Sequence, residues 1–192
     1  AGILVCICFR SIRLQGDDRS CQEGQAQMVC HILSYRGSCN IHIRLMGSGR
    51  TYFVSDVHLG LQVADPQERE RRFADFLNSL PEDTESLYML GDIWDFWYEY
   101  RDVVPKGYVR VFAALQDLMD KGVQVYFFQG NHDVWTYSYF EELGMKRLLQ
   151  PAVVEIEGKR FCLGHGDGLG PVPAGYRFLR GVFHCRPLQV LF

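Results

Sequence analysis

The sequence lacks both an excess of positive charge and a long apolar run. Its formal net charge is −3 over 192 residues, which excludes the basic surface that nucleic-acid binding requires, so we expect no nucleic-acid partner. No apolar stretch approaches the roughly 20 residues of a membrane-spanning helix. The opening stretch AGILVCICF is as long as a signal-peptide core, but no basic segment precedes it and no cleavage region follows it, so we do not expect export. These absences predict a globular cytoplasmic protein.

Cysteine is absent between residues 46 and 161, although the chain contains seven cysteines, five of them in the first 45 residues. No two of those five form a CxxC pair, which argues against a zinc site, and the rest of the chain does not resemble a secreted disulfide module. The first 45 residues also lack lysine and show no period of 2 or 3.6 residues. We therefore predict that residues 1–45 are foreign to the fold or form a disordered extension, and that the folded domain begins at Met46.

From Met46 onward, strand patterns and helix patterns alternate. Phe73, Phe76 and Leu77, for example, share one face of a helical pattern. An alternation of this kind implies an α/β fold with a mostly parallel sheet, whose ligands lie beyond the carboxyl ends of the strands. The patterns predict strands at 51–56, 86–92 and 123–133, helices at 67–81, 108–121 and 136–143, and a β-hairpin at 153–167 turned at Glu157-Gly158.

Polar side chains follow four of these predicted strands at the point where each one ends. Taken singly, each group has an ordinary explanation as a turn, a helix cap or a polar loop. Their joint occurrence, in order, at four strand ends indicates a single site at one edge of the sheet. The four groups are Asp56-Val57-His58, Gly91-Asp92, Gly130-Asn131-His132-Asp133 and Gly164-His165-Gly166-Asp167.

The mixture of carboxylate, amide and imidazole groups suits a pair of divalent metal ions. Oxygen from Asp and Asn together with nitrogen from His favours Mn²⁺, Fe²⁺ or Zn²⁺ over Ca²⁺. One carboxylate can bridge two ions that lie roughly 3.5–4 Å apart. Glycines before Asp92, Asn131 and His165 allow the backbone to turn sharply at each ligand. The sequence therefore predicts a dinuclear metal site.

The blocks DVHL, GDIWD, GNHD and GHGD resemble the signature of the calcineurin-like metallophosphoesterases. The four blocks agree with that signature in order and spacing over residues 51–169. The resemblance implies an α/β/β/α sandwich, of which residues 46–169 form the N-terminal part, incomplete at the C-terminus. It also implies a metal-dependent hydrolase of phosphoric esters or pyrophosphates with two divalent ions as cofactors, of which Mn²⁺ is the expected metal.

The same resemblance assigns metal ligands residue by residue. It implies that Asp56 and His58 bind one ion and that Asp92 bridges both ions. Asn131 and His165 would bind the second ion.

The stretches GDIWDFWYEY and HGDGLGPVPAGYRFLR most closely resemble the UDP-2,3-diacylglucosamine pyrophosphatases of lipid A biosynthesis. This resemblance implies hydrolysis of a UDP-linked diacylated glucosamine lipid to UMP and 2,3-diacylglucosamine 1-phosphate. His132 would be catalytic, stabilising phosphoryl oxygens or protonating the leaving group, while Asn131 and Tyr176 would contact the substrate. Residues 170–192 would begin a helical cap, and the lipid substrate implies peripheral contact with the cytoplasmic face of the inner membrane.

Three features depart from the family pattern. His132 stands where many members have arginine, and Val172 and Pro173 stand where many have acidic residues. No GHxH block follows His165, so five of the seven expected ligands are present. We therefore expect a C-terminally truncated chain with little or no turnover by itself. Two alternatives stay open: a phosphodiesterase or phosphatase acting on a soluble nucleotide, and a non-catalytic fragment or accessory protein. The sequence does not predict an oligomeric state.

Overall fold

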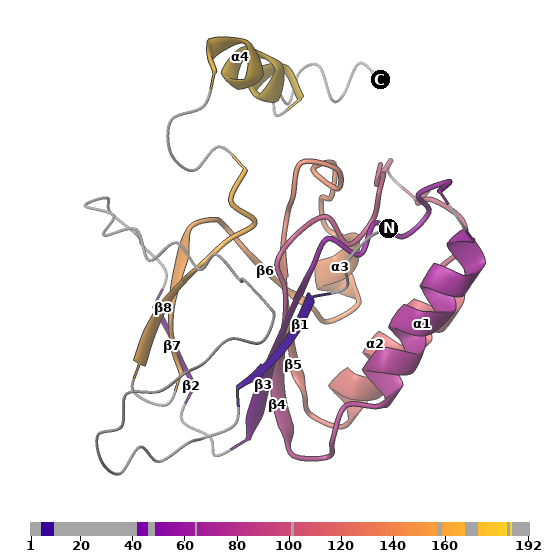
Figure 1. Ribbon diagram of the computed structural model, residues 1–192, viewed down its shortest axis with the longest axis vertical. Coiled ribbons are helices and arrows are strands. Elements are labelled where there is room, and N and C mark those ends of the chain that lie inside the picture. Colours follow the sequence, from indigo (N-terminus) through magenta and orange to yellow (C-terminus); the bar gives the residue numbers. More distant parts are fainter. Residues whose placement is uncertain are drawn as a thin grey trace, which may run out of the picture.

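The centre of the molecule is a five-stranded sheet with the strand order β1-β3-β4-β5-β6 (Figure 1). The computed structural model describes residues 5–9, 42–45, 49–63, 65–100, 102–156, 159–167, 173–183 and 185. Within the sheet, β3 to β6 pair in parallel and β1 pairs antiparallel with β3. The strands are β1 (Val5–Phe9), β3 (Arg50–Ser55), β4 (Thr84–Met89), β5 (Gln124–Phe128) and β6 (Lys146–Leu148).

Helices cover one face of this sheet, with α1 and α2 side by side and the short α3 next to β6 (Figure 1). The start of α1 is determined locally: Pro66 occupies its first position, and the Asp65 side chain accepts hydrogen bonds from the N–H groups of Gln67 and Glu68 at 2.9 and 3.1 Å. The apolar side chains of α1 and α2 pack on β3, β4 and β5 as the larger core. The helices are α1 (Pro66–Asn78), α2 (Val109–Asp120) and α3 (Tyr139–Glu142).

A second, three-stranded sheet with the order β2-β7-β8 packs on the other face (Figure 1). Its strands are β2 (His42–Leu45), β7 (Ala152–Ile156) and β8 (Lys159–Leu163). A smaller core fills the space between the sheets, with stacked aromatic rings from the main sheet facing aliphatic side chains from β7 and β8. The helical layer and the two sheets form an α/β/β arrangement, and the mixed α/β fold with a parallel sheet is confirmed.

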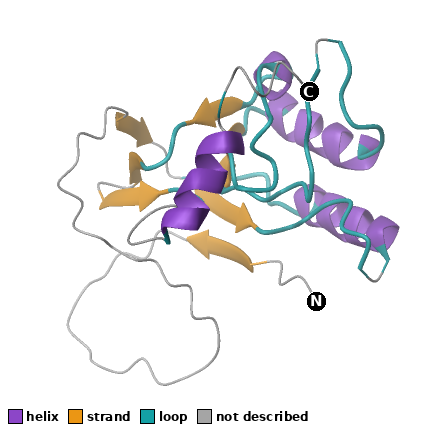
Figure 2. Cartoon of the chain, turned by 90° about the horizontal axis from the view of Figure 1, so that it is seen from above, coloured by secondary structure: helices purple, strands orange, loops and turns teal. Residues whose placement is uncertain are grey.

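The helix α4 (Ala174–Phe183) follows the second sheet and lies beyond one end of both sheets (Figure 1). Seen from above, it crosses over the strands, with α1 and α2 to one side (Figure 2). The indole Nε1 of Trp135 donates to the main-chain oxygen of Phe183 at 2.9 Å, which joins α4 to the loop after β5. No helix in the described part of the chain combines the length and apolar character needed to cross a membrane.

The structure differs from the sequence-based elements at several places. The strand β6 has no counterpart among the predicted elements, and the helix predicted at 136–143 is reduced to α3. The shorter helix begins at Tyr139, and at this N-terminus the Glu99 carboxylate accepts the N–H groups of residues 137–139, which have no acceptor within the helix. β1 and β2 both come from residues 1–45, and the prediction that this segment is foreign to the fold stays a prediction.

Candidate metal centre

The loops that follow β3 and β4 continue to pair beyond the last residues of the strands. Asp56 N donates to Gly91 O at 3.2 Å, and His58 N donates to Asp92 O at 3.0 Å. The two loops therefore leave the sheet side by side. This arrangement brings Asp56, His58 and Asp92 to the same edge, as parallel pairing requires.

These three residues share a left-handed backbone conformation, with φ values of 55° at Asp56, 49° at His58 and 52° at Asp92. A residue other than glycine is uncommon in this region, and each instance costs roughly 1–2 kcal/mol. Such strain is retained where the surrounding structure determines the direction of a side chain. Its concentration at three predicted ligands supports a functional site at this edge.

Gly91 and Gly130 pack backbone against backbone and allow the ligand-bearing loops to approach one another. A Cβ atom at Gly91 would lie 2.8 Å from Gly130 Cα and 2.9 Å from His165 Cγ. A Cβ atom at Gly130 would lie 2.5 Å from Asp92 N. All three separations are well below van der Waals contact, so neither position has room for a side chain.

We expect Gly91→Ala to lower the free energy of unfolding by about 2–5 kcal/mol and to weaken metal binding. The methyl group would face left-handed strain of roughly 1–2 kcal/mol and overpacking of roughly 1–3 kcal/mol. Urea unfolding and Mn²⁺ titration measure the two effects. The matched control is Gly122→Ala, because Gly122 has a similar φ of +90° but nothing within 4 Å of an added Cβ. Equal losses in both variants would contradict the close approach of the loops.

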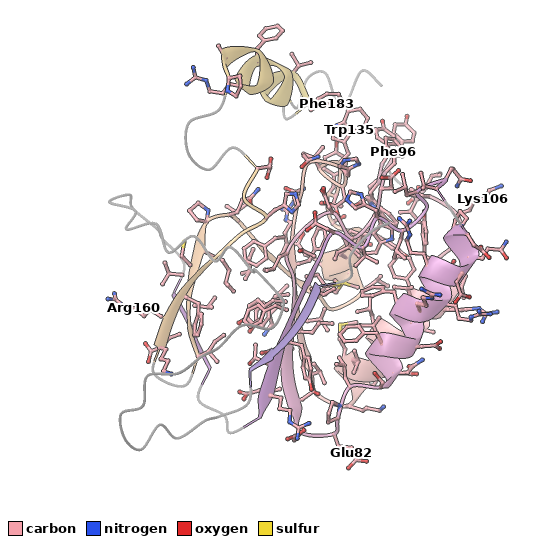
Figure 3. The ribbon with its side chains drawn as sticks, in the orientation of Figure 1. Glu82, Phe96, Lys106, Trp135, Arg160 and Phe183 are labelled. Atoms are coloured by element: carbon pink, nitrogen blue, oxygen red, sulfur yellow. The ribbon has the colours of Figure 1, made fainter. Side chains whose placement is uncertain are left out.

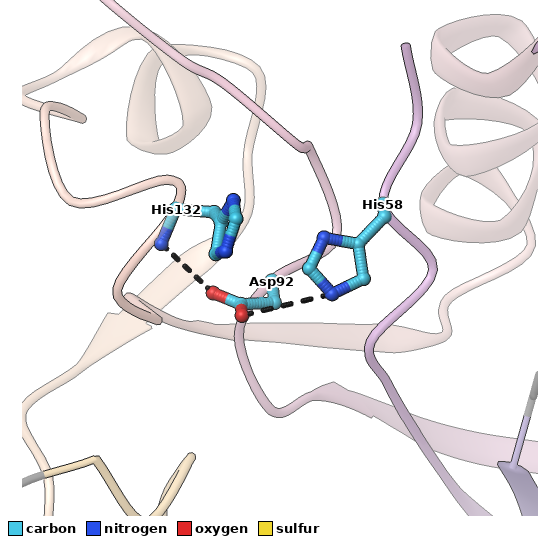
Figure 4. A group of neighbouring side chains, drawn as sticks. All are labelled: His58, Asp92 and His132. Atoms are coloured by element: carbon cyan, nitrogen blue, oxygen red, sulfur yellow. Dashed lines mark hydrogen bonds and ion pairs between the residues drawn. The ribbon is translucent and has the colours of Figure 1, made fainter. Parts of the chain in front are cut away.

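The first group of possible ligands consists of His58, Asp92 and His132, whose donor atoms all lie within 4.8 Å of one another (Figure 4). His58 Nε2 lies 3.8 Å from Asp92 Oδ2, and His132 N donates to Asp92 Oδ1 at 3.0 Å. Asp95 contacts both imidazoles: its Oδ1 lies 3.1 Å from His58 Nδ1, and its main-chain oxygen lies 2.9 Å from His132 Nδ1. Asp95 therefore orients both rings, a role that the sequence analysis missed although Asp95 ends the block GDIWD.

The second group consists of Asp56, Asp92 and His165, whose donor atoms also lie within 4.8 Å of one another. His165 Nε2 lies 3.3 Å from Asp92 Oδ2 and 3.2 Å from Asn131 Oδ1. The other ring nitrogen, Nδ1, lies 3.1 Å from Leu90 O. Asp92 therefore belongs to both groups, as expected for a carboxylate shared by two ions.

The pKa values of Asp92 and His165 indicate which charge this site favours. Burial alone would raise the pKa of Asp92, but hydrogen bonds from the His165 ring and from His132 N–H hold that pKa below its usual value. Burial alone would lower the pKa of His165, but Asp92, with smaller contributions from Asp56 and Asp167, raises it to about 9. The carboxylates therefore favour a positive charge beside them, and a divalent cation satisfies the same electrostatic demand.

The donor set fits divalent transition-metal ions. Carboxylate oxygen combined with imidazole nitrogen suits these metals. His58 and His165 each use Nδ1 for a carboxylate or carbonyl oxygen, which leaves Nε2 facing Asp92, and metal-binding histidines are typically oriented in this way. In the structure Asp56 is grouped with His165, whereas the sequence analysis paired Asp56 with His58, so the assignment of each ligand to one ion stays a prediction.

Asp133, the last residue of GNHD, has a role that the sequence analysis did not assign. Its side chain is fully buried, and its carboxylate accepts from Gly130 N at 2.7 Å and from Ile93 N at 2.9 Å, with longer contacts to the N–H groups of Asp92 and Trp94. Burial raises the pKa of Asp133 to about 6, although the N–H groups of Gly130, Ile93 and Trp94 act in the opposite direction. Asp133 therefore joins the loop after β4 to the loop after β5.

The structure brings the six predicted residues at the strand ends to one edge of the molecule. These are Asp56, His58, Asp92, Asn131, His132 and His165. Tyr176, the other residue predicted to contact substrate, lies in α4, but its side chain is outside the described residues.

Comparison with known families gives one match over most of the chain. The family model described as calcineurin-like phosphoesterase matches residues 49–188. The crystal structure of Pseudomonas putida nuclease MPE covers 55% of this chain and 49% of that protein at 22% identity, with a TM-score of 0.35, which is too low to support an inference.

Several similar proteins carry the name UDP-2,3-diacylglucosamine hydrolase. The one from Porphyromonas gingivalis is 44% identical over 138 residues, which is 71% of this chain and 50% of that protein. Those from Aeromonas salmonicida and Escherichia coli are each 34% identical over 74% of this chain, and they are covered to 55% and 58% of their length. The chain spans about half the length of the curated relatives it matches.

Proposed function

The chain belongs to the calcineurin-like phosphoesterase family, and on that premise we propose that its gene product is a dinuclear metal hydrolase of UDP-2,3-diacylglucosamine. The enzyme cleaves the pyrophosphate to give UMP and 2,3-diacylglucosamine 1-phosphate, a step of lipid A biosynthesis. The observation that carries the chemistry is the sharing of buried Asp92 by two groups of possible metal ligands. Similarity to hydrolases named for this substrate supports the choice of substrate.

Two divalent ions, with Mn²⁺ as the expected metal, complete the site. The residues that would hold them are Asp56, His58, Asp92, Asn131 and His165, whose mixed oxygen and nitrogen donors suit Mn²⁺. When bound, the ions would polarise the phosphoryl group under attack and stabilise the charge that develops on its oxygens.

The side chains of His132 and Asn131 are placed to act on the substrate itself. The His132 ring is 42% exposed, and its Nδ1 contacts Asp95, which leaves Nε2 for the substrate. In this proposal, Nε2 donates to a phosphoryl oxygen or protonates the leaving group. The Asn131 amide has its oxygen beside His165, which leaves its NH₂ group for a phosphoryl oxygen. Tyr176 supplies a further substrate contact from α4.

An aromatic surface, formed by Phe96, Tyr98, Trp135 and Phe183, supports the proposal of a lipid substrate. Figure 3 shows Phe96, Trp135 and Phe183 close to one another. The centroid of the nearest Trp135 ring lies 6.4 Å from Phe96, 5.1 Å from Tyr98 and 6.0 Å from Phe183. Phe96 is 61% exposed and directly follows Asp95, the residue that contacts His132. An acyl chain lying on this surface would therefore be adjacent to the phosphoryl-transfer site.

The proposal also divides the chain into parts with different roles. Residues 46–169 supply the metal ligands, and residues 170–192 begin a helical cap over the aromatic surface. The contact between Trp135 and Phe183 of α4 supports this placement. A lipid substrate also places the enzyme at the cytoplasmic face of the inner membrane as a peripheral protein.

An assay of the complete gene product tests this proposal. With Mn²⁺ present, we expect UMP release from UDP-2,3-diacylglucosamine in detergent micelles to be at least about 100-fold faster than from UDP-N-acetylglucosamine. Burying only four methylene groups at about 0.8 kcal/mol each supplies the roughly 3 kcal/mol that this ratio needs. Product masses identify the bond that is cleaved, and EDTA should abolish the reaction.

Each contrary outcome has a distinct meaning. Faster hydrolysis of UDP-N-acetylglucosamine than of UDP-2,3-diacylglucosamine would indicate that the enzyme acts on a soluble nucleotide and not on a lipid. An absence of hydrolysis with either substrate, in protein shown to bind Mn²⁺, would favour a non-catalytic role.

A further inference from the structure

We propose that Gln150 is a positioning residue of the metal centre. Its amide fixes the loop that carries His165 against the segment after β5 that carries Asn131. Gln150 lies in the connection between β6 of the main sheet and β7 of the second sheet. It belongs to none of the four motif blocks. The inference depends on the proposed metal centre but not on the identity of the substrate.

The Gln150 amide contacts two chain segments at once. Its Oε1 accepts from His165 N at 2.7 Å and from Gly166 N at 3.3 Å. Its Nε2 donates to Asp167 Oδ1 at 2.7 Å and to Gln129 O at 3.3 Å. Gln129 is the last residue before Gly130-Asn131, so one side chain joins the segments that deliver two predicted ligands.

The orientation of the amide follows from these contacts. The oxygen faces two N–H donors, and the NH₂ group faces a carboxylate oxygen and a carbonyl oxygen. Exchanging the two ends would place donors against donors and acceptors against acceptors. A glutamate at this position could not donate to Asp167, and an apolar side chain could neither donate nor accept.

By holding the main chain of His165, Gln150 also limits the orientation of the His165 ring. Gln150 holds His165 N, while the ring Nδ1 lies 3.1 Å from Leu90 O. With both points held, Nε2 is directed to within 3.3 Å of Asp92 Oδ2 and 3.2 Å of Asn131 Oδ1. A metal site requires its ligands to be held to within about 0.5 Å, and residues that orient ligands typically change metal affinity by about 10–100-fold.

The test compares Gln150→Met, which retains the length of the side chain but loses all four hydrogen bonds, with Gln124→Met as a matched control. Gln124 also joins two segments, because it contacts Lys146 of β6, but it lies at the opposite end of β5 from Asn131. Calorimetric titration of the metal-free gene product with Mn²⁺ gives the affinities, and circular dichroism gives the melting temperature of the metal-free form.

We expect Gln150→Met to weaken one of two Mn²⁺ sites by about 10–100-fold and to leave the other within about threefold of the wild type. Gln124→Met should bind both ions as the wild type does, whatever its melting temperature. Unchanged Mn²⁺ affinities in Gln150→Met would overturn the inference, as would a loss in Gln124→Met that matches it.

Two further outcomes separate this inference from the proposed function. If the wild-type protein binds two Mn²⁺ ions but does not hydrolyse the lipid, the proposed substrate is wrong. The Mn²⁺ affinities of the Gln150 variants then still test the positioning role. Wild-type protein that binds fewer than two ions overturns the positioning role. If Gln150→Met does not fold, Gln150→Glu replaces it, because the glutamate keeps the accepting oxygen. Wild-type affinities in that variant would show that the contacts with Asp167 and Gln129 do not position the site.

Discussion

Replacing Asp92 with alanine is expected to reduce the rate of hydrolysis by at least about 10³-fold and to remove the binding of a second Mn²⁺ ion. The Asp92 side chain is 5% exposed and belongs to both groups of possible ligands, with Oδ2 3.8 Å from His58 Nε2 and 3.3 Å from His165 Nε2. Metal ions contribute several kcal/mol of transition-state stabilisation, and about 4 kcal/mol corresponds to a factor of 10³. Initial rates of UMP release and calorimetric Mn²⁺ titration measure the two losses.

Two comparison variants distinguish the loss of the shared charge from other effects of the substitution. Asp92→Asn keeps the size of the side chain and the oxygen that accepts from His132 N, so its loss reports the missing charge rather than a cavity. Asp95→Asn removes the charge of a side chain whose Oδ1 lies 3.1 Å from His58 Nδ1 and 3.4 Å from His132 Nδ1. Asp95 does not join both ligand groups, so we expect a smaller loss of about 10–100-fold. A rate near that of the wild type in Asp92→Ala would show that Asp92 does not bridge the ions.

Replacing Asp133 with alanine is expected to lower the free energy of unfolding by about 3–5 kcal/mol, because it leaves buried main-chain donors without an acceptor. The carboxylate accepts most closely from Gly130 N at 2.7 Å and from Ile93 N at 2.9 Å, where no other partner replaces it in the described part of the chain. Denaturant unfolding of the metal-free protein measures this loss without a contribution from bound ions. Asp133→Asn should also destabilise the protein, because its NH₂ group would face N–H donors.

Asp117→Ala is the matched control for Asp133, since Asp117 is exposed on α2 and its removal should change stability by less than about 0.5 kcal/mol. A small effect of Asp133→Ala would mean that the loops after β4 and β5 hold their positions without this carboxylate. Their conformation would then depend on the parallel pairing and the glycine contacts alone.

Much of the fold could be predicted because its signals are local. The apolar stripe that predicts the first helix includes Phe73 and Leu77, which are buried in α1, and such a stripe depends only on spacing within a few turns. The candidate ligands could also be predicted, because parallel strands deliver the residues at their carboxyl ends to one edge. Asp56, His58 and Asp92 lie together for this reason.

Other elements could not be predicted, because neighbouring strands create them. The segment Lys146–Leu148 is only three residues long and has no alternating pattern, and it becomes β6 by pairing with Tyr126–Phe128 at the edge of β5. β1 likewise pairs with β3, from a segment without strand periodicity. Hydrogen bonding to an available sheet edge can therefore outweigh a weak local preference.

By itself, the sequence determined the order of the longer strands and of the helices after Met46, the family and the residues that meet at the strand ends, because periodicity and motif spacing are properties of neighbouring residues. Only the tertiary structure decided how these residues are held. Asp133 reaches Ile93 across 40 positions, and Gln150 reaches His165 across 15. The sequence around a polar side chain does not indicate a hydrogen-bond partner so far along the chain. Its hydrogen bonds form only when folding has brought two loops together and removed the water that would otherwise satisfy them.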